Sequence, residues 1–230
     1  MNKYLRYFVF LLLTCLALLL IGMGLSVFLQ DKIKHSVIEE INKSLNTPAS
    51  VSEIDFSVLR FFPNASITLK NVVIKGNPWQ DTKRPLLKAG KIDLVLSITS
   101  IFSSTMQLKK LEISDAELNI LTNEKGQKND QIFKQGNDNN NFAAEFKKVY
   151  LKNVNLLIEN KPTNFILQTH LNKGLATGNF KDKIFELKTE TDLFAEVIQH
   201  ENIAYIKQKP IELSGVISVD LRNDIYAFND

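Results

Sequence analysis

The chain has 230 residues with 28 lysines and arginines against 25 aspartates and glutamates, which gives a formal net charge of +3. The basic residues are spread along the chain, so the sequence lacks the basic stripe that marks a nucleic-acid-binding protein, and we expect no nucleic-acid partner. The 15 phenylalanines, 9 glycines and 6 prolines exclude a low-complexity chain and favour an ordered, β-rich one.

A long apolar stretch without any charged residue, residues 7–30, follows a short head, residues 1–6. As a helix rising about 1.5 Å per residue it measures roughly 36 Å, which is enough to cross a hydrocarbon core of about 30 Å. A cleaved signal peptide is the alternative, because Lys3 and Arg6 supply its basic start. The apolar run is longer than the roughly 7–15 residues of such signals, so we predict a retained single-pass transmembrane helix.

The charges that flank this stretch are nearly balanced, with Lys3 and Arg6 before it and Lys32 and Lys34 after it. We expect the N-terminal head in the cytoplasm, because a long C-terminal part is exported largely regardless of its charge. The only cysteine, Cys15, lies within the predicted span, so the exported part has no intramolecular disulfide.

Residues 31–47 are predicted as an amphipathic helix that continues the membrane helix and covers the end of a sheet. Ile33, Val37, Ile41 and Leu45 recur there at helical spacing. Pro48 ends the helix, because a proline disfavours the helical conformation of the residue before it.

From residue 48 to residue 230 the apolar period changes to two, which predicts strands with one apolar face. We expect roughly a dozen short strands in one β-rich domain; the apolar runs lie at 51–56, 66–74, 92–98, 107–113, 116–121, 146–151, 154–159, 164–171, 176–180, 183–188, 193–199, 202–207, 211–221 and 225–228. Ser114 and Asp115 separate two runs, which are either a strand pair or one bent strand. Lys152 with Asn153, and Gly174, are interpreted as further breaks.

A nearly all-polar stretch, residues 123–141, is predicted as a mobile loop. No long amphipathic helix follows residue 47, so helices are not available to cover the apolar strand faces. The sheet must therefore pack on another sheet, close on itself, or keep a groove that something apolar fills. The sequence permits all three.

The sequence offers no recognisable catalytic or metal site. His35, His170 and His200 are isolated from one another and from any cysteine at metal-ligand spacing, and no nucleotide-binding or hydrolase motif is present. We interpret acidic residues such as Asp93, Asp115 and Glu117 as solvated side chains of the sheet. We therefore predict a protein that is not an enzyme and holds no cofactor or metal.

Four motifs in order give the N-terminal half a specific resemblance. A Phe62-Pro63 turn is followed by "L-x-N-V-x-I" at residues 69–74, by "LL-x-A-x-x-I-x-L-x-L-S" at residues 86–97, and by an "I-x-D-A-x-L-N-I" type of segment at residues 113–120. From residue 1 to about 122 the chain resembles the start of the AsmA family of bacterial envelope proteins. From residue 123 onward only the strand rhythm supports the interpretation.

The resemblance implies a helix in the bacterial inner membrane, a periplasmic body, and a curved antiparallel β-sheet that forms a groove with an apolar inner face. It also implies a role in outer-membrane biogenesis, either in carrying phospholipid or in supporting assembly. Many family members are much longer than this chain. We expect the strand pattern to continue beyond residue 230, or the chain to be a short member that joins partners.

The candidate lipid-groove residues are the inward side of two strands: Ile92, Leu94, Leu96, Ile98, Leu118 and Ile120. The alternative is that the same residues form an ordinary core between two sheets. The predicted partners are the membrane and phospholipid. A second hypothesis is an assembly factor that recruits an envelope protein by strand addition at its C-terminal sheet edge, after Ile211.

Overall fold

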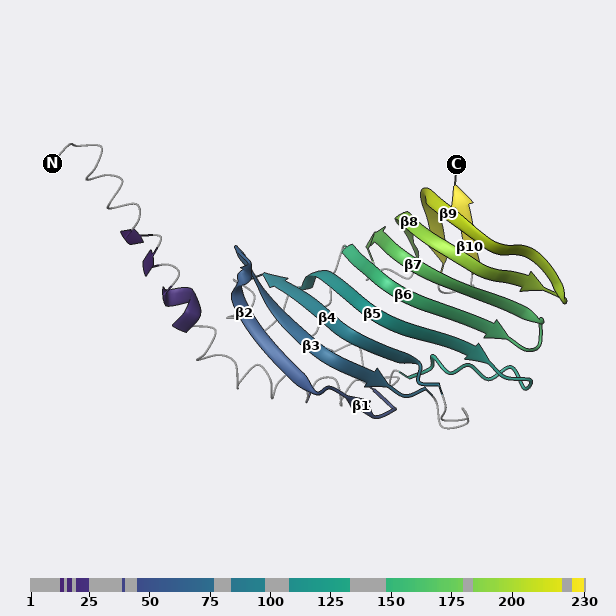
Figure 1. Cartoon of the computed structure of the whole chain (residues 1–230), viewed down its shortest axis with the longest axis horizontal. Coiled ribbons are helices and arrows are strands. Elements are labelled where there is room, and N and C mark those ends of the chain that lie inside the picture. Colours follow the sequence, from purple (N-terminus) through teal and green to yellow (C-terminus); the bar gives the residue numbers. More distant parts are fainter. Residues whose placement is uncertain are drawn as a thin grey trace.

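The computed structural model describes residues 13–14, 16–17, 20–24, 39, 45–76, 84–97, 108–132, 148–179, 184–220 and 225–229 (Figure 1). Residues 20–24 are helical. Nowhere in these ranges is there a helix with the length and apolar character that crossing a membrane requires. The predicted head at 1–6, most of the predicted span at 7–30 and most of the predicted helix at 31–47 lie outside the described residues.

The described chain forms one curved, open sheet of ten strands (Figure 1). The strands are β1 (Ala49–Ser50), β2 (Glu53–Phe61), β3 (Asn64–Ile74), β4 (Leu87–Ser97), β5 (Leu108–Thr122), β6 (Lys148–Asn160), β7 (Phe165–Thr177), β8 (Ile184–His200), β9 (Ile203–Asp220) and β10 (Ile225–Asn229). Their order is β1-β3-β4-β5-β6-β7-β8-β9-β10, and β2 also pairs with β3. The prediction of a mainly β chain is confirmed.

Nine pairings in this sheet connect its neighbours, and only the pairing of β5 with β6 is parallel. The parallel pair divides the sheet into a first half, β1 to β5, and a second half, β6 to β10. Since parallel strands point the same way, β5 and β6 begin at the same end of the sheet. That end also holds the turn between β2 and β3.

The strands are fewer and longer than the sequence predicts. The bent-strand alternative for Ser114 and Asp115 is the right one, because both lie inside β5. The predicted breaks at Asn153 and Gly174 are wrong, since these residues lie within β6 and β7. Turn-forming residues here bend a strand without ending it. The local sequence is the same whether such a residue ends a strand or only bends it.

The physical reason is a line of inserted residues across five strands, which we call the bulge row: Asn71, Gly90, Asp115, Asn153 and Asn172. On one side of the row Lys70, Lys91, Ser114, Lys152 and Lys173 pair across the strands, and on the other side Val72, Ala89, Ala116, Val154 and Leu171 pair. The strands keep the same register on both sides of the row, but the positions that join the apolar cluster change from odd to even or the reverse, as from Leu69 to Val72 on β3 and from Ile92 to Ala89 on β4. The alternation of side chains therefore shifts by one at the same level of each strand.

Three members of the bulge row have positive φ: Asn71 at 49°, Asp115 at 53° and Asn153 at 53°. Asn and Asp adopt this left-handed conformation more readily than other residues with a Cβ. A Cβ at Gly90 would lie 3.2 Å from the Cβ of Asp115, so glycine permits the close approach of β4 and β5. The Asn153 Nδ2 donates to the Asp115 Oδ1 at 2.6 Å, which links two members of the row.

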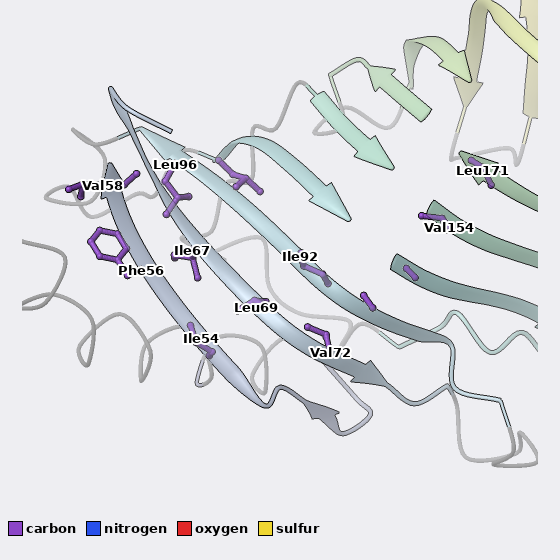
Figure 2. Close-up of a cluster of buried hydrophobic side chains, with 14 residues drawn as sticks. Ile54, Phe56, Val58, Ile67, Leu69, Val72, Ile92, Leu96, Val154 and Leu171 are labelled. Carbon is purple, nitrogen blue, oxygen red and sulfur yellow. The ribbon is translucent and has the colours of Figure 1, made fainter. Parts of the chain in front are cut away.

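Alternation gives the sheet two chemically distinct sides. The apolar face carries the pairs Leu69 with Ile92, Ile92 with Ile113 and Ile113 with Leu151. The polar face carries Lys70, Asp93, Glu112 and their cross-strand neighbours. Figure 2 shows the apolar side chains of neighbouring strands gathered on one side of the first half.

The first ten residues of the predicted mobile loop, 123–132, make specific contacts with β5. The backbone N–H of Leu121 donates to the Asn129 Oδ1 at 2.8 Å, and the Asn129 Nδ2 donates to the Asn119 carbonyl at 2.7 Å. Asn129 is completely buried. Ile132 packs in a small cluster with Leu45 and Leu86, while residues 133–141 lie outside the described residues.

Candidate functional site

The candidate groove residues lie on one face of the sheet. Ile92, Leu94 and Leu96 belong to β4, and Leu118 and Ile120 belong to β5; all five lie on the apolar face. Ile98 lies outside the described residues. The sequence pattern therefore identifies the face, but these residues are not equally accessible on it.

Ile92 and Leu96 are buried, at 7% and 1% exposed. Both belong to the large apolar cluster that also includes Ile67 and Leu69 from β3 (Figure 2). Leu94, Leu118 and Ile120 are only partly buried. A side chain that is buried in this way serves as core, so Leu94 and the β5 residues are the more accessible members of the predicted set.

The more accessible part of the apolar face lies in the second half, which the sequence analysis did not select. On β8 and β9 the partly buried Thr191 and Leu193 pair with Leu213 and Ile211. Leu193 also packs at the border of the large cluster. The signal was present in the sequence: Glu190, Asp192 and similar charges at every second position of β8 leave the intervening positions on the other face.

On the polar face, Asp93 is 1% exposed, so the prediction that its carboxylate is solvated is wrong. The Thr68 hydroxyl donates to its Oδ1 at 2.6 Å. The Lys91 Nζ lies 2.6 Å from Oδ2, and the Arg60 guanidinium lies 3.4 Å from Oδ1. These groups from β2, β3 and β4 cover the carboxylate and satisfy it, which is how a buried charge is tolerated.

Asp115 and Glu117 are exposed, as predicted. Further along the polar face, hydrogen bonds from the Lys70 ammonium to Asp55 and then Glu53 raise the pKa of Lys70 above its ordinary value of 10.5. The Lys70 Nζ lies 2.8 Å from the Asp55 Oδ2 and 3.1 Å from the Glu53 Oε2. The polar side of the first half is thus held by paired charges.

The polar face is hollowed beside the bulge row. An open hollow of about 930 Å³ crosses β5 to β9. Lys152 and Lys173 face each other across β6 and β7, and Asp192 and Glu212 face each other across β8 and β9. Charges of both signs line it, so it favours no single charged ligand. No group of three His, Cys, Asp or Glu that could hold a metal ion occurs among the described residues.

The comparisons with known proteins agree with the motifs. The model of the AsmA family matches residues 1–181. No curated protein matches the chain. The family match extends past residue 122, through β6 and β7, so it covers the parallel pair, the whole bulge row and part of the accessible apolar face.

Proposed function

The chain belongs to the AsmA family, and from this premise we propose that it is an envelope protein that binds phospholipid along the apolar face of its sheet. Family membership supports an envelope-related role. In the proposal the N-terminal helix spans the inner membrane and the sheet stands in the periplasm. The sheet then acts in outer-membrane biogenesis by holding or conducting acyl chains.

The observation that carries the proposal is the continuity of the apolar face beyond its buried part. Side chains such as Leu151, Leu193 and Leu213 continue the face across β6, β8 and β9 and remain partly exposed. Removing such surface from water is favourable, and an acyl chain would remove it. The neighbouring positions on the polar face of β8 and β9, such as Glu190, Asp192 and Glu212, are charged and exposed, so a bound lipid is expected on the apolar side.

A test uses photocrosslinking in intact cells, with a photoreactive residue at Leu213 and, as matched control, at Glu212. These neighbours on β9 lie on opposite faces, and neither is fully buried. We expect phospholipid capture at Leu213 and none at Glu212. A second pair, Leu193 with Asp192, repeats the comparison on β8. Asp93 is unsuitable as a control, because its carboxylate is buried and bonded.

Equal capture at both members of a pair, or none at either in a folded protein, would contradict lipid binding on the apolar face. Capture of a protein would favour the second candidate, an assembly factor that recruits a partner by strand addition. One observation favours it: β10 pairs only with residues 216–220 of β9. Residues 203–215 of β9 have β8 on one side and no other strand among the described residues on the other, and such an edge accepts strands.

A further inference from the structure

The turn between β2 and β3 presents an unusual side chain. Phe62 is 70% exposed, the largest value among the large apolar residues that the structure describes. It occupies a tight turn with Pro63 directly after Phe61, at the end of the sheet where β5 and β6 begin. A single exposed leucine is ordinary, but an aromatic side chain at the tip of a turn offers most of its surface to one partner.

This turn lies beside the described part of the N-terminal helix. A Cβ placed on Gly22 would lie 2.8 Å from the Leu59 Cδ2 and 3.3 Å from the Val58 Cγ2. Gly22 therefore lies against Val58 and Leu59 of β2, and Figure 1 shows the purple helical segment beside the end of that strand. On the same segment Leu20 and Ile21 are 60% and 59% exposed. Exposed apolar surface thus continues from the helix towards the turn.

Basic residues surround the same end of the sheet. The described residues there include Arg60 at the end of β2, Lys109 and Lys110 at the start of β5, and Lys148 at the start of β6. Lys109 and Lys148 are exposed. Lys110 pairs with Glu112 at 2.7 Å. Its Nζ also lies 5.3 Å from the centre of the Phe61 ring and 4.3 Å from that of Tyr150.

We propose that the Phe62 turn enters the surface of the bilayer that holds the N-terminal helix, with Phe62 among the acyl chains and the exposed Lys109 and Lys148 at anionic phospholipid head groups. Aromatic side chains flanked by lysine and arginine are typical of segments that lie in a membrane interface, and cations near an anionic surface add to the attraction. The inference rests on the proposed membrane anchor. The second contact fixes the sheet so that the apolar face starts at the bilayer surface.

The test measures the depth of spin labels in the full chain, reconstituted in vesicles of phosphatidylethanolamine and phosphatidylglycerol. Cys15→Ala removes the only native cysteine, and single cysteines are then placed by Phe62→Cys, Leu20→Cys or Thr163→Cys. The label is itself apolar, so it substitutes for the ring of Phe62. Thr163 is the matched control, because it is exposed in the turn between β6 and β7 at the opposite end of the sheet.

We expect the label at 62 to collide readily with oxygen, which concentrates in the bilayer, and poorly with a water-soluble nickel chelate. The label at 163 should show the reverse, and the label at 20 should be protected from nickel. If position 62 is as accessible to nickel as position 163 while position 20 is protected, the inference fails and the anchor stands. Nickel access at position 20 would overturn the anchor as well. Protection at 62 from both reagents would indicate a protein cover and would also overturn the inference.

A second arm tests the charges. The double variant Lys109→Glu with Lys148→Glu, combined with the label at 62, should raise nickel collision severalfold in anionic vesicles and should change little in neutral phosphatidylcholine vesicles. Lys125→Glu with Lys128→Glu, exposed at the opposite end of the sheet, is the matched control and should have no effect. An equal response of both double variants would exclude a specific head-group contact.

Discussion

The two halves of the sheet follow the same alternating pattern but differ in how far their apolar face is closed. In the first half Ala65 and Ile67 are completely buried, and Leu96 is 1% exposed. In the second half Ala195 and Val219 are also buried, but other side chains of the same face, such as Leu193 and Leu213, are only partly buried. The comparison shows that alternation determines which face is apolar, whereas burial depends on what lies over that face.

The polar faces of the two halves differ in a parallel way. The first half holds Asp93 in a buried group with Lys91, Thr68 and Arg60. Like charges lie opposite one another in both halves, with Asp93 opposite Glu112 in the first and Asp192 opposite Glu212 in the second. Like charges directly opposite one another destabilise a sheet. In the first half Lys91, Thr68 and Arg60 offset this cost at the buried Asp93, whereas Asp192 and Glu212 of the second half are exposed to solvent.

The largest difference between the halves is expected for truncation of apolar side chains. Leu96→Ala removes a fully buried side chain and should lower the free energy of unfolding by about 2–5 kcal/mol. Leu213→Ala removes a partly exposed one and should lower it by less than about 1.5 kcal/mol. Denaturant titration of both variants in the same detergent measures the difference. Equal losses would mean that the second half is as closed as the first.

The buried carboxylate should give the next effect. Asp93→Ala leaves Lys91, Thr68 and Arg60 without their shared acceptor and should lower the free energy of unfolding by about 1–3 kcal/mol. Asp192→Ala removes an exposed carboxylate that faces Glu212, and its effect should lie within about 1 kcal/mol. The same titration compares them. A smaller loss for Asp93→Ala than for Asp192→Ala would contradict the assignment of the buried group.

The bulge row should give effects of similar size in both halves, because it crosses the parallel pair. Asn71→Val and Asn153→Val place a β-branched residue at positive φ and should each lower the free energy of unfolding by about 1–2 kcal/mol. Asn71→Gly and Asn153→Gly accept this conformation and serve as controls, although they also lose a side-chain hydrogen bond. Thermal unfolding followed by circular dichroism measures both pairs. Equal midpoints for the valine and glycine variants would exclude backbone strain as the cause.

The smallest effect concerns alkaline pH and compares one lysine from each half. Hydrogen bonds with Asp55 and Glu53 raise the pKa of Lys70, and a hydrogen bond with Glu159 raises the pKa of Lys161, from the ordinary 10.5. A pKa raised on folding stabilises the fold fully below the unfolded value, and this contribution is lost as the pH rises through the folded value. Lys70→Met and Lys161→Met should therefore reduce the alkaline loss of stability slightly. Lys173→Met, which removes a lysine of the polar face without an ion pair among the described contacts, serves as the control.

The sequence predicted the β architecture and the apolar face. An apolar period of two residues indicates strands, and it also shows which side chains share one face. It placed Ile92, Leu94, Leu96, Leu118 and Ile120 on one side of the sheet, where the structure has them. It could not separate the buried Leu96 from the partly exposed Leu94, because burial depends on contacts between segments distant in the chain. The prediction for Asp93 failed for the same reason, since its partners come from three strands.

Strand boundaries were the other limit. Asp115 and Asn153 have the composition of turns, and nothing in the local sequence distinguishes a turn that ends a strand from a residue that bends one. At Asn71 the predicted run 66–74 correctly continues through the residue. Internal comparison would have helped: "Lys-Asn-Val" occurs at both 70–72 and 152–154. Both copies lie in the bulge row.

The bulge row has a consequence for how the sheet is assembled. Sliding any of these strands by one residue past its neighbour would turn its apolar side chains to the polar face. Between β5 and β6 it would also separate Asp115 from Asn153, whose side chains are hydrogen-bonded. The bulge row therefore favours a single register among the strands β3 to β7. An open sheet with exposed apolar surface is prone to faulty pairing with other chains. The bulge row disfavours such pairing, while the apolar face stays accessible.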